Sequence, residues 1–236
     1  LPAAGGDAPD PRALEEAAAL IASAQRPFLY AGGGVTASGA GEELSRLAEN
    51  LNAPMGASMM GLSAVAHSHP LFLGMTGMHG RYAASTAMAR SDLIIAVGTR
   101  FSDRATGNKR AFSQGRKILH IDIDPAEIGK NIPAYASLVG DVKKALAALN
   151  ALGLKRGGEG DAWRREAQAL KAAPDNHLAM DEGRLNPQLV IRAVNERAGA
   201  QALVATDVGQ HQMWAAQYYR FERPRTFITS GGLGTM

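Results

Sequence analysis

The strongest constraint on the fold is an alternation of short apolar segments with longer segments rich in Ala and Leu. The run 92–98 (DLIIAVG) is apolar throughout between a polar residue and a glycine. Such a run is typical of a parallel strand covered by helices on both faces, because neither face then needs polar side chains. Segments with a helical pattern separate this run from its neighbours, so we expect an α/β protein with a doubly wound parallel sheet.

The same patterns predict the individual elements. Strands are expected at 27–31, 53–60, 92–98, 117–122 and 137–139, and helices at 11–25, 41–51, 82–89 and 142–152. The alternation of helices and strands begins again after Arg184, with helices expected at 187–197 and 210–219 and strands at 202–206 and 226–228. The predicted organisation is a linker (1–10), a central domain (11–153), an interdomain linker with a short helix (154–184) and the start of a second α/β domain (185–236). Both ends are expected to be cut from a longer protein.

Composition excludes several classes of function. The formal net charge is +3, and the basic residues are scattered instead of forming a stripe among aromatics, so we expect no nucleic-acid partner. The chain has no cysteine, which excludes disulfides, zinc–thiolate sites and thiol catalysis. It has no apolar run long enough to span a membrane. A cytoplasmic location is the expectation.

A glycine loop follows the first predicted strand. Gly32-Gly33-Gly34-Val35-Thr36-Ala37 satisfies the loose dinucleotide pattern, in which glycines let the backbone approach a phosphate at a helix N-terminus. A nicotinamide-binding fold then needs an acidic residue at the end of the second strand, and the stretch 52–59 (NAPMGASM) has none. Hydride transfer is therefore disfavoured, and a tight turn without a ligand stays open for this motif alone.

Ligand-compatible residues follow each predicted strand of the central domain. Glycines allow close backbone approach, arginines can meet phosphates, aspartates can accept hydrogen bonds from a ribose or an adenine, and methionines can line an apolar slot. These strand ends are 58–60 (SMM), 77–80 (GMHG), 98–100 (GTR), 122–124 (DID) and 140–142 (GDV). Taken together they favour a large, extended nucleotide ligand, although His79 alone has a purely structural alternative.

The second α/β segment has two loops compatible with phosphate. Gln210 and His211 lie in the first turn of a predicted helix, where backbone N–H groups and the helix dipole favour a diphosphate, and Asp207 is a candidate cap. The loop 230–236 (SGGLGTM) is rich in glycine and follows a predicted strand. Two such loops in one short segment indicate a single cofactor held at both.

The ordered motifs resemble those of acetolactate synthase catalytic subunits, which are thiamine-diphosphate enzymes. They are 78–80 (MHG), 98–104 (GTRFSDR), 120–131 (HIDIDPAEIGKN), 208–214 (VGQHQMW) and 230–236 (SGGLGTM), and the resemblance covers nearly the whole chain apart from the linkers. It implies a central FAD-binding domain followed by the beginning of the thiamine-diphosphate domain. FAD would be required structurally, since the reaction has no net redox step.

The resemblance assigns cofactor contacts position by position. The implied FAD contacts are Gly33, Ser58, Met59, Gly77, Met78, His79, Gly98, Arg100, Asp103, Asp122, Ile123, Asp141 and Val142, joined by Gly231 and Gly232. The implied thiamine-diphosphate contacts are Gln210, His211, Gly234 and Met236, with Met236 as the apolar wedge against the bent cofactor.

The implied reaction decarboxylates pyruvate and transfers the two-carbon unit to a second pyruvate or to 2-oxobutyrate. The products are 2-acetolactate or 2-aceto-2-hydroxybutyrate, on the route to branched-chain amino acids. Further implied partners are a second copy of the subunit in a homo-oligomer and a regulatory small subunit. The resemblance assigns no catalytic residue to this chain, because it implies that the activating Glu belongs to another domain and that the Mg²⁺ motif lies beyond Met236.

Two positions depart from the family pattern, and related activities remain as alternatives. Ser102 stands where Asp is usual, and Arg81 stands where Thr is usual, which leaves the start of the following helix open. The alternatives are another thiamine-diphosphate enzyme, such as glyoxylate carboligase or a pyruvate oxidase, and a non-catalytic nucleotide-binding module. This chain on its own is expected to be inactive.

Overall fold

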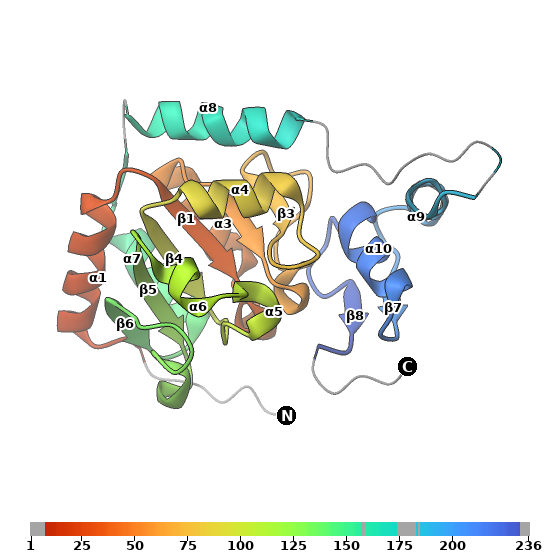
Figure 1. Ribbon diagram of the computed structural model, residues 1–236. Helices are drawn as coiled ribbons and strands as arrows, with labels where there is room; N and C mark the ends of the chain where they lie inside the picture. Colours follow the sequence, from red (N-terminus) through yellow and green to blue (C-terminus); the bar gives the residue numbers. More distant parts are fainter. Residues whose placement is uncertain (1–7, 157–158, 174–182, 184, 232–236) are drawn as a thin grey trace.

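The computed structural model describes residues 8–156, 159–173, 183 and 185–231 of the 236-residue chain. A larger central unit (8–156 and 159–173) contains a six-stranded sheet, and a smaller C-terminal unit (185–231) contains a two-stranded one. Figure 1 shows the two side by side, with the smaller unit on the right.

The central sheet is parallel throughout. Its strands are β1 (Pro27–Ala31), β2 (Met55–Ala57), β3 (Phe72–Met75), β4 (Leu93–Val97), β5 (Lys117–Asp122) and β6 (Ala136–Val139). They lie in the order β3-β2-β1-β4-β5-β6, and every adjacent pair is parallel. All the carboxyl ends therefore lie at one edge. The predicted α/β fold class is confirmed.

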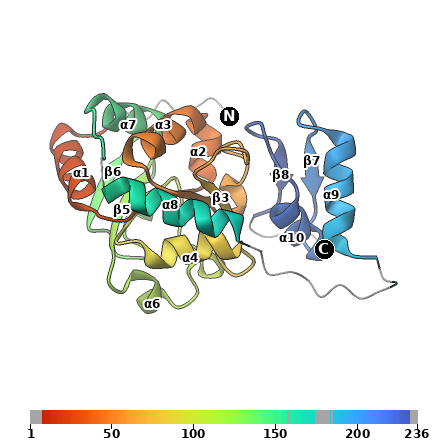
Figure 2. The same ribbon diagram turned by 90° about the horizontal axis from the view of Figure 1, so that it is seen from above.

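Helices cover both faces of this sheet and bury its apolar side chains (Figures 1 and 2). On one face, α1 (Pro11–Ser23), α3 (Gly41–Leu51) and α7 (Val142–Ala151) pack with one set of strand residues, which includes Leu29 and Ile95. On the other face, α4 (Tyr82–Arg90) and α8 (Glu159–Ala172) pack with the alternate residues, which include Phe28 and Ile94. Alternation along each strand thus supplies an apolar surface to both layers.

Helix α8 is anchored to the sheet although it lies in the segment predicted as an interdomain linker (154–184). Its Trp163 is 3% exposed, and the indole Nε1–H donates to the Pro27 carbonyl at 2.9 Å. Glu166 pairs with Arg90 at 2.8 Å and with Arg26 at 3.4 Å. Part of this segment therefore packs as a structural layer of the central unit, and the position of the domain boundary stays a prediction.

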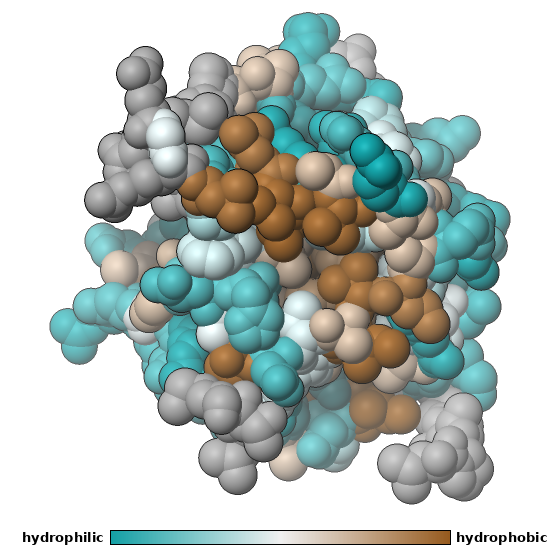
Figure 3. Space-filling model, turned by 90° about the vertical axis from the view of Figure 1, so that its right-hand side faces the viewer, coloured by the Kyte–Doolittle hydropathy of each residue, from teal (hydrophilic) through white to brown (hydrophobic). Residues whose placement is uncertain are grey.

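The C-terminal unit consists of α9 (Pro187–Ala198), β7 (Val204–Thr206), α10 (Gln210–Tyr218) and β8 (Phe227–Thr229), with β7 and β8 parallel. Its Ala216, Tyr219 and Phe221 join the first core of the central unit. Figure 3 views this side, where apolar residues gather at the surface; the exposed ones in this unit include Leu185, Leu189, Val194, Leu203 and Ile228. Such apolar side chains stay exposed because a sheet of two strands is too small to bury them.

Several short elements differ from the sequence-based expectation. The segment 53–60, predicted as a strand with its exit loop, contains the short strand β2, and its exit continues as a 3₁₀ turn at Met59–Gly61. Strand β3 and the short helices α2 (Gly33–Ser38), α5 (Asp103–Thr106) and α6 (Lys109–Ser113) were not predicted. Helix α2 forms despite glycines in its first turn, because its backbone packs against the turn after β4. Tertiary contact outweighs local propensity there.

Candidate functional site

The carboxyl edge of the six-stranded sheet brings the predicted strand ends together. The order changes direction between β1 and β4, so the loops after these central strands diverge to opposite sides. In doubly wound sheets, ligands bind beyond the carboxyl ends at this switch point. The carboxyl edge, where the arrowheads of the strands lie in Figure 1, is therefore the candidate site.

The glycine loop after β1 touches the turn after β4. Gly32 N donates to the Val97 carbonyl at 2.8 Å, and Gly34 N donates to the Gly98 carbonyl at 3.0 Å. A Cβ on Gly32 would overlap the Gly98 carbonyl, and one on Gly34 would lie 2.7 Å from Gly98 Cα. Gly32 and Gly34 are thus required by backbone packing. A Cβ on Gly33, the predicted ligand contact, would meet only Met60 among the described residues, at 3.1 Å, so Gly33 is the least enclosed of the three glycines.

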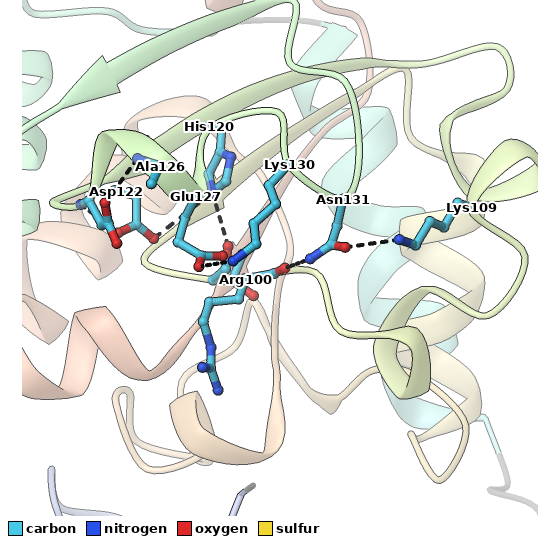
Figure 4. A network of polar contacts seen from close by, with 10 residues as sticks. Arg100, Lys109, His120, Asp122, Ala126, Glu127, Lys130 and Asn131 are labelled. Atoms are coloured by element: carbon cyan, nitrogen blue, oxygen red, sulfur yellow. Dashed lines mark hydrogen bonds and ion pairs between the residues drawn. The ribbon is translucent and has the colours of Figure 1, made fainter.

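The turn that carries Arg100 is held by side chains from β5 and the loop beyond it (Figure 4). His120 Nε2 lies 2.9 Å from the Thr99 carbonyl, and Asn131 Nδ2 donates to the Arg100 carbonyl at 2.8 Å. Lys109 Nζ in turn donates to Asn131 Oδ1 at 2.9 Å. These bonds fix the backbone on both sides of Arg100, whose side chain remains exposed.

Phe101 stabilises the same turn from its buried side. It is 1% exposed and has a φ of 50°, a left-handed conformation that is costly for a residue with a bulky side chain. Its ring packs against His120 at 5.1 Å, Phe112 at 5.8 Å and Tyr30 at 6.0 Å between centroids. Burial of this ring offsets the backbone strain. Arg100 and Asp103 are then left on the exposed side of the turn.

The acidic residues predicted at the edge have different environments. Asp122 is 8% exposed and accepts a hydrogen bond from Asp124 N at 3.0 Å, while its neighbour Ile123 is 46% exposed. Asp141 caps α7 by accepting from Lys144 N at 3.0 Å, and Val142 is buried behind it. Asp103 accepts a hydrogen bond from the backbone N–H of Arg104 at 2.9 Å, so the contact between these two residues involves the backbone of Arg104.

The methionine side of the edge lies at β2 and β3. Ser58 and Met59 follow β2 and are half-buried. Gly77, Met78 and His79 follow β3, and Met78 is 70% exposed. The predicted FAD contacts within the described residues of the central unit thus share one edge.

The candidate diphosphate site lies at the corresponding edge of the small sheet. Helix α10 begins at Gln210 with Gly209 at the N-cap position, for which Asp207 had been a candidate. Gln210 and His211 are exposed in its first turn, and Gln212 donates to Thr229 Oγ1 at 2.6 Å and to the Ser230 carbonyl at 3.0 Å. The second glycine loop is thereby held beside the helix. Gly231 is described and exposed, whereas Gly232, Gly234 and Met236 lie outside the described residues.

Burial shifts two titratable groups beneath the central edge. Desolvation lowers the pKa of His120, with its Thr99 bond and nearby Asp122 opposing the shift. Desolvation also raises the pKa of Tyr30. A neutral His120 donates from Nε2 to Thr99, so it positions the turn without carrying charge. Sequence reasoning did not single out His120 or Asn131, although both stand in the 120–131 motif.

The chemistry of the edge is that of binding. It offers glycine backbone, an exposed arginine, carboxylates and apolar methionines, which suit the phosphates, sugar and rings of an extended nucleotide. No group of His, Cys, Asp or Glu in the described part of the chain is arranged to hold a metal ion. Nor is any helix there long and apolar enough to cross a bilayer. The fold defines a doubly wound α/β unit whose polar and glycine residues gather at the carboxyl edge of its sheet.

Comparison with known proteins gives the family. The thiamine pyrophosphate enzyme central domain matches residues 14–149, and the C-terminal TPP binding domain of the same enzymes matches residues 207–236. The chain therefore belongs to the thiamine pyrophosphate enzyme family; thiamine pyrophosphate is another name for thiamine diphosphate.

Curated relatives match over nearly the whole chain. The chain is 46% identical to the acetolactate synthase large subunit of Mycobacterium tuberculosis over 97% of its own length and 38% of that subunit. It is 44% identical to a probable acetolactate synthase large subunit of Methanocaldococcus jannaschii, over 96% of this chain and 39% of that protein. The Haemophilus influenzae acetolactate synthase large subunit is 42% identical over 94% of this chain. The chain thus spans about two fifths of the length of these relatives.

Proposed function

We propose that this chain is the flavin-binding central domain and the first part of the thiamine-diphosphate domain of an acetolactate synthase large subunit. The observation that carries the proposal is 46% identity to such a subunit over 97% of the chain. The similarity includes both ligand-compatible edges. It therefore supports a shared cofactor arrangement as well as a shared fold.

FAD is proposed to bind at the carboxyl edge of the six-stranded sheet. Arg100 would meet its phosphates, and Asp122 would accept hydrogen bonds from it. Gly33 and Gly98, which have no side chain, would let FAD approach the protein backbone closely. Exposed Met78 and Ile123 would cover its apolar parts. The flavin would serve as a structural cofactor, and the residues of this edge hold it without exchanging electrons.

Thiamine diphosphate is proposed to bind at the edge of the small sheet, and when bound it supplies the centre at which 2-oxo acids are decarboxylated. Gln210 and His211 would bind the diphosphate side at the N-terminus of α10, a position where the helix dipole stabilises negative charge. Gly234 and Met236 would meet the cofactor's pyrimidine side. Gln212 keeps the glycine loop beside this helix through its bond to the Ser230 carbonyl. The Mg²⁺ ligands and the activating Glu are proposed to belong to other parts of the full-length subunit.

The proposed reaction of the full-length subunit joins two pyruvates, or pyruvate and 2-oxobutyrate, with release of CO₂. Its products would be 2-acetolactate and 2-aceto-2-hydroxybutyrate, precursors of branched-chain amino acids. A homo-oligomer, a regulatory small subunit and a cytoplasmic location are part of the same proposal.

The test is product analysis with the full-length protein that contains this chain. With thiamine diphosphate, Mg²⁺ and FAD, pyruvate should give 2-acetolactate, identified by mass spectrometry and NMR. A preference for glyoxylate with formation of tartronate semialdehyde would replace the proposal by a carboligase of that type. Binding of both cofactors without turnover of any 2-oxo acid would point instead to a non-catalytic module.

A further inference from the structure

An arginine of the C-terminal unit forms hydrogen bonds with the central unit. Arg225 Nε donates to the Thr36 carbonyl at 3.1 Å, and its Nη2 donates to the Ala37 carbonyl at 2.7 Å. Both carbonyls belong to the last turn of α2, where a cation is favoured by the helix dipole. Arg225 has a φ of 61°, so its backbone accepts strain while the side chain makes this fork.

A second bond joins α10 to the loop after β3. Gln217 Nε2 donates to the His79 carbonyl at 2.7 Å. The same helix begins with Gln210 and His211, the proposed diphosphate contacts, and His79 is a proposed flavin contact. One helix therefore reaches from one candidate site to the other.

The loop after β2 contacts both α2 and the C-terminal unit. Thr36 Oγ1 donates to the Met60 carbonyl at 3.3 Å, and a Cβ on Gly231 would overlap Met60 Sδ. The loops after β1, β2 and β3 thus all meet the C-terminal unit. The turn after β4 is held instead from inside the central unit, by His120 and Asn131.

We propose that Arg225 and Gln217 are positioning residues that couple the occupancy of the two cofactor sites. This rests on the proposed function, because it presumes a flavin at one edge and thiamine diphosphate at the other. A flavin that orders the loops after β1 and β3 fixes the carbonyls to which Arg225 and Gln217 bind. The first turn of α10 is then held in place for the diphosphate. Because coupling between two sites is reciprocal, thiamine diphosphate strengthens flavin binding by the same factor.

The experiment measures the dissociation constant of thiamine diphosphate for the full-length protein, with and without saturating FAD. The variants are Arg225→Lys, Arg225→Ala and Arg225→Ala combined with Gln217→Ala. Arg223→Ala is the matched control, since Arg223 lies in the same loop and bonds to Gln201 within its own unit. Thermal unfolding of each variant is recorded in parallel.

We expect FAD to tighten thiamine-diphosphate binding of the unmodified protein by roughly fivefold or more. The factor should fall toward one in the double alanine variant, be intermediate in Arg225→Lys, which keeps the charge and loses the fork, and stay unchanged in Arg223→Ala. Unchanged coupling in the Arg225 variants, or no coupling in the unmodified protein, overturns the proposal. If the double variant unfolds, the Arg225→Lys measurement decides. Failure of the unmodified protein to bind either cofactor would contradict the proposed function instead.

Discussion

Replacing His67 by phenylalanine should change how the stability of this chain depends on pH. The ring of His67 packs on Phe72 at 4.9 Å and on Phe221 at 5.2 Å between centroids, at the junction of the two units. Its Nε2 lies 3.0 Å from the Leu62 carbonyl, and its backbone N–H donates to the Phe221 carbonyl at 2.9 Å. Burial lowers the pKa of this imidazole from 6.5 to about 4. The Leu62 bond and Glu222 oppose the shift, while Arg81 and Lys171 add to it.

The sign follows from where the proton binds. The unfolded chain protonates His67 near pH 6.5 and the folded chain only near pH 4, so protons stabilise the unfolded state across this window. One pKa unit corresponds to about 1.36 kcal/mol, which sets an upper limit of about 3.4 kcal/mol for the loss. Because His67 is half-buried, we expect about 2 kcal/mol. The loss should begin as the pH falls below 6.5 and level off below about 4.

The assay is urea unfolding followed by circular dichroism between pH 7.5 and 4. Phenylalanine keeps the ring packing, loses the Leu62 bond at a cost of about 1 kcal/mol, and cannot take a proton. His67→Phe should therefore be less stable than the unmodified chain near neutral pH and equal or more stable near pH 4.5. His79→Phe is the control, because the His79 side chain is exposed. Parallel pH profiles for His67→Phe and the unmodified chain would refute the reasoning.

Three further predictions concern packing and ligand binding. Trp163→Phe should lower the free energy of unfolding by about 1–3 kcal/mol in urea titrations, because the buried Pro27 carbonyl loses its donor; an effect below about 0.5 kcal/mol would show that this bond does not anchor α8. Leu47→Ala should cost about 2–5 kcal/mol, since Leu47 is 0% exposed in the first core, and a value near zero would contradict that packing. Titration calorimetry of this chain alone should give weak FAD binding, because the family resemblance implies that another domain supplies part of the flavin site and each tenfold loss of affinity corresponds to about 1.4 kcal/mol. Tight, stoichiometric binding would contradict this.

Strong local patterns predicted most of the fold. The strands at 27–31 and 117–122 and the helix at 41–51 are found with the predicted bounds, because their apolar patterns and flanking residues are unambiguous. Strand β3 was missed because it is only 4 residues long and includes Gly74. Helix α2 was missed because its formation depends on contact with Gly98, which lies far away in the sequence.

The sequence predicted where the candidate site lies, but not the contacts that hold its loops in place. Glycine, arginine and aspartate at successive strand ends pointed to the carboxyl edge, and parallel pairing brings them to it. The sequence did not reveal that His120, Asn131 and buried Phe101 fix the backbone around Arg100. Nor did it reveal the hydrogen bonds of Arg225 to the end of α2. These contacts join distant residues, and no local pattern encodes them.

The central claim is that the carboxyl edge of the six-stranded sheet is the flavin site. The most direct test is hydrogen–deuterium exchange of this chain with and without saturating FAD. We predict slower exchange in peptides covering 77–80, 98–104 and 120–124. A hollow of about 440 Å³ lies at the opposite edge, lined by residues that include Leu20, Asp92 and Lys117. Protection there, with none at the carboxyl edge, would contradict the account.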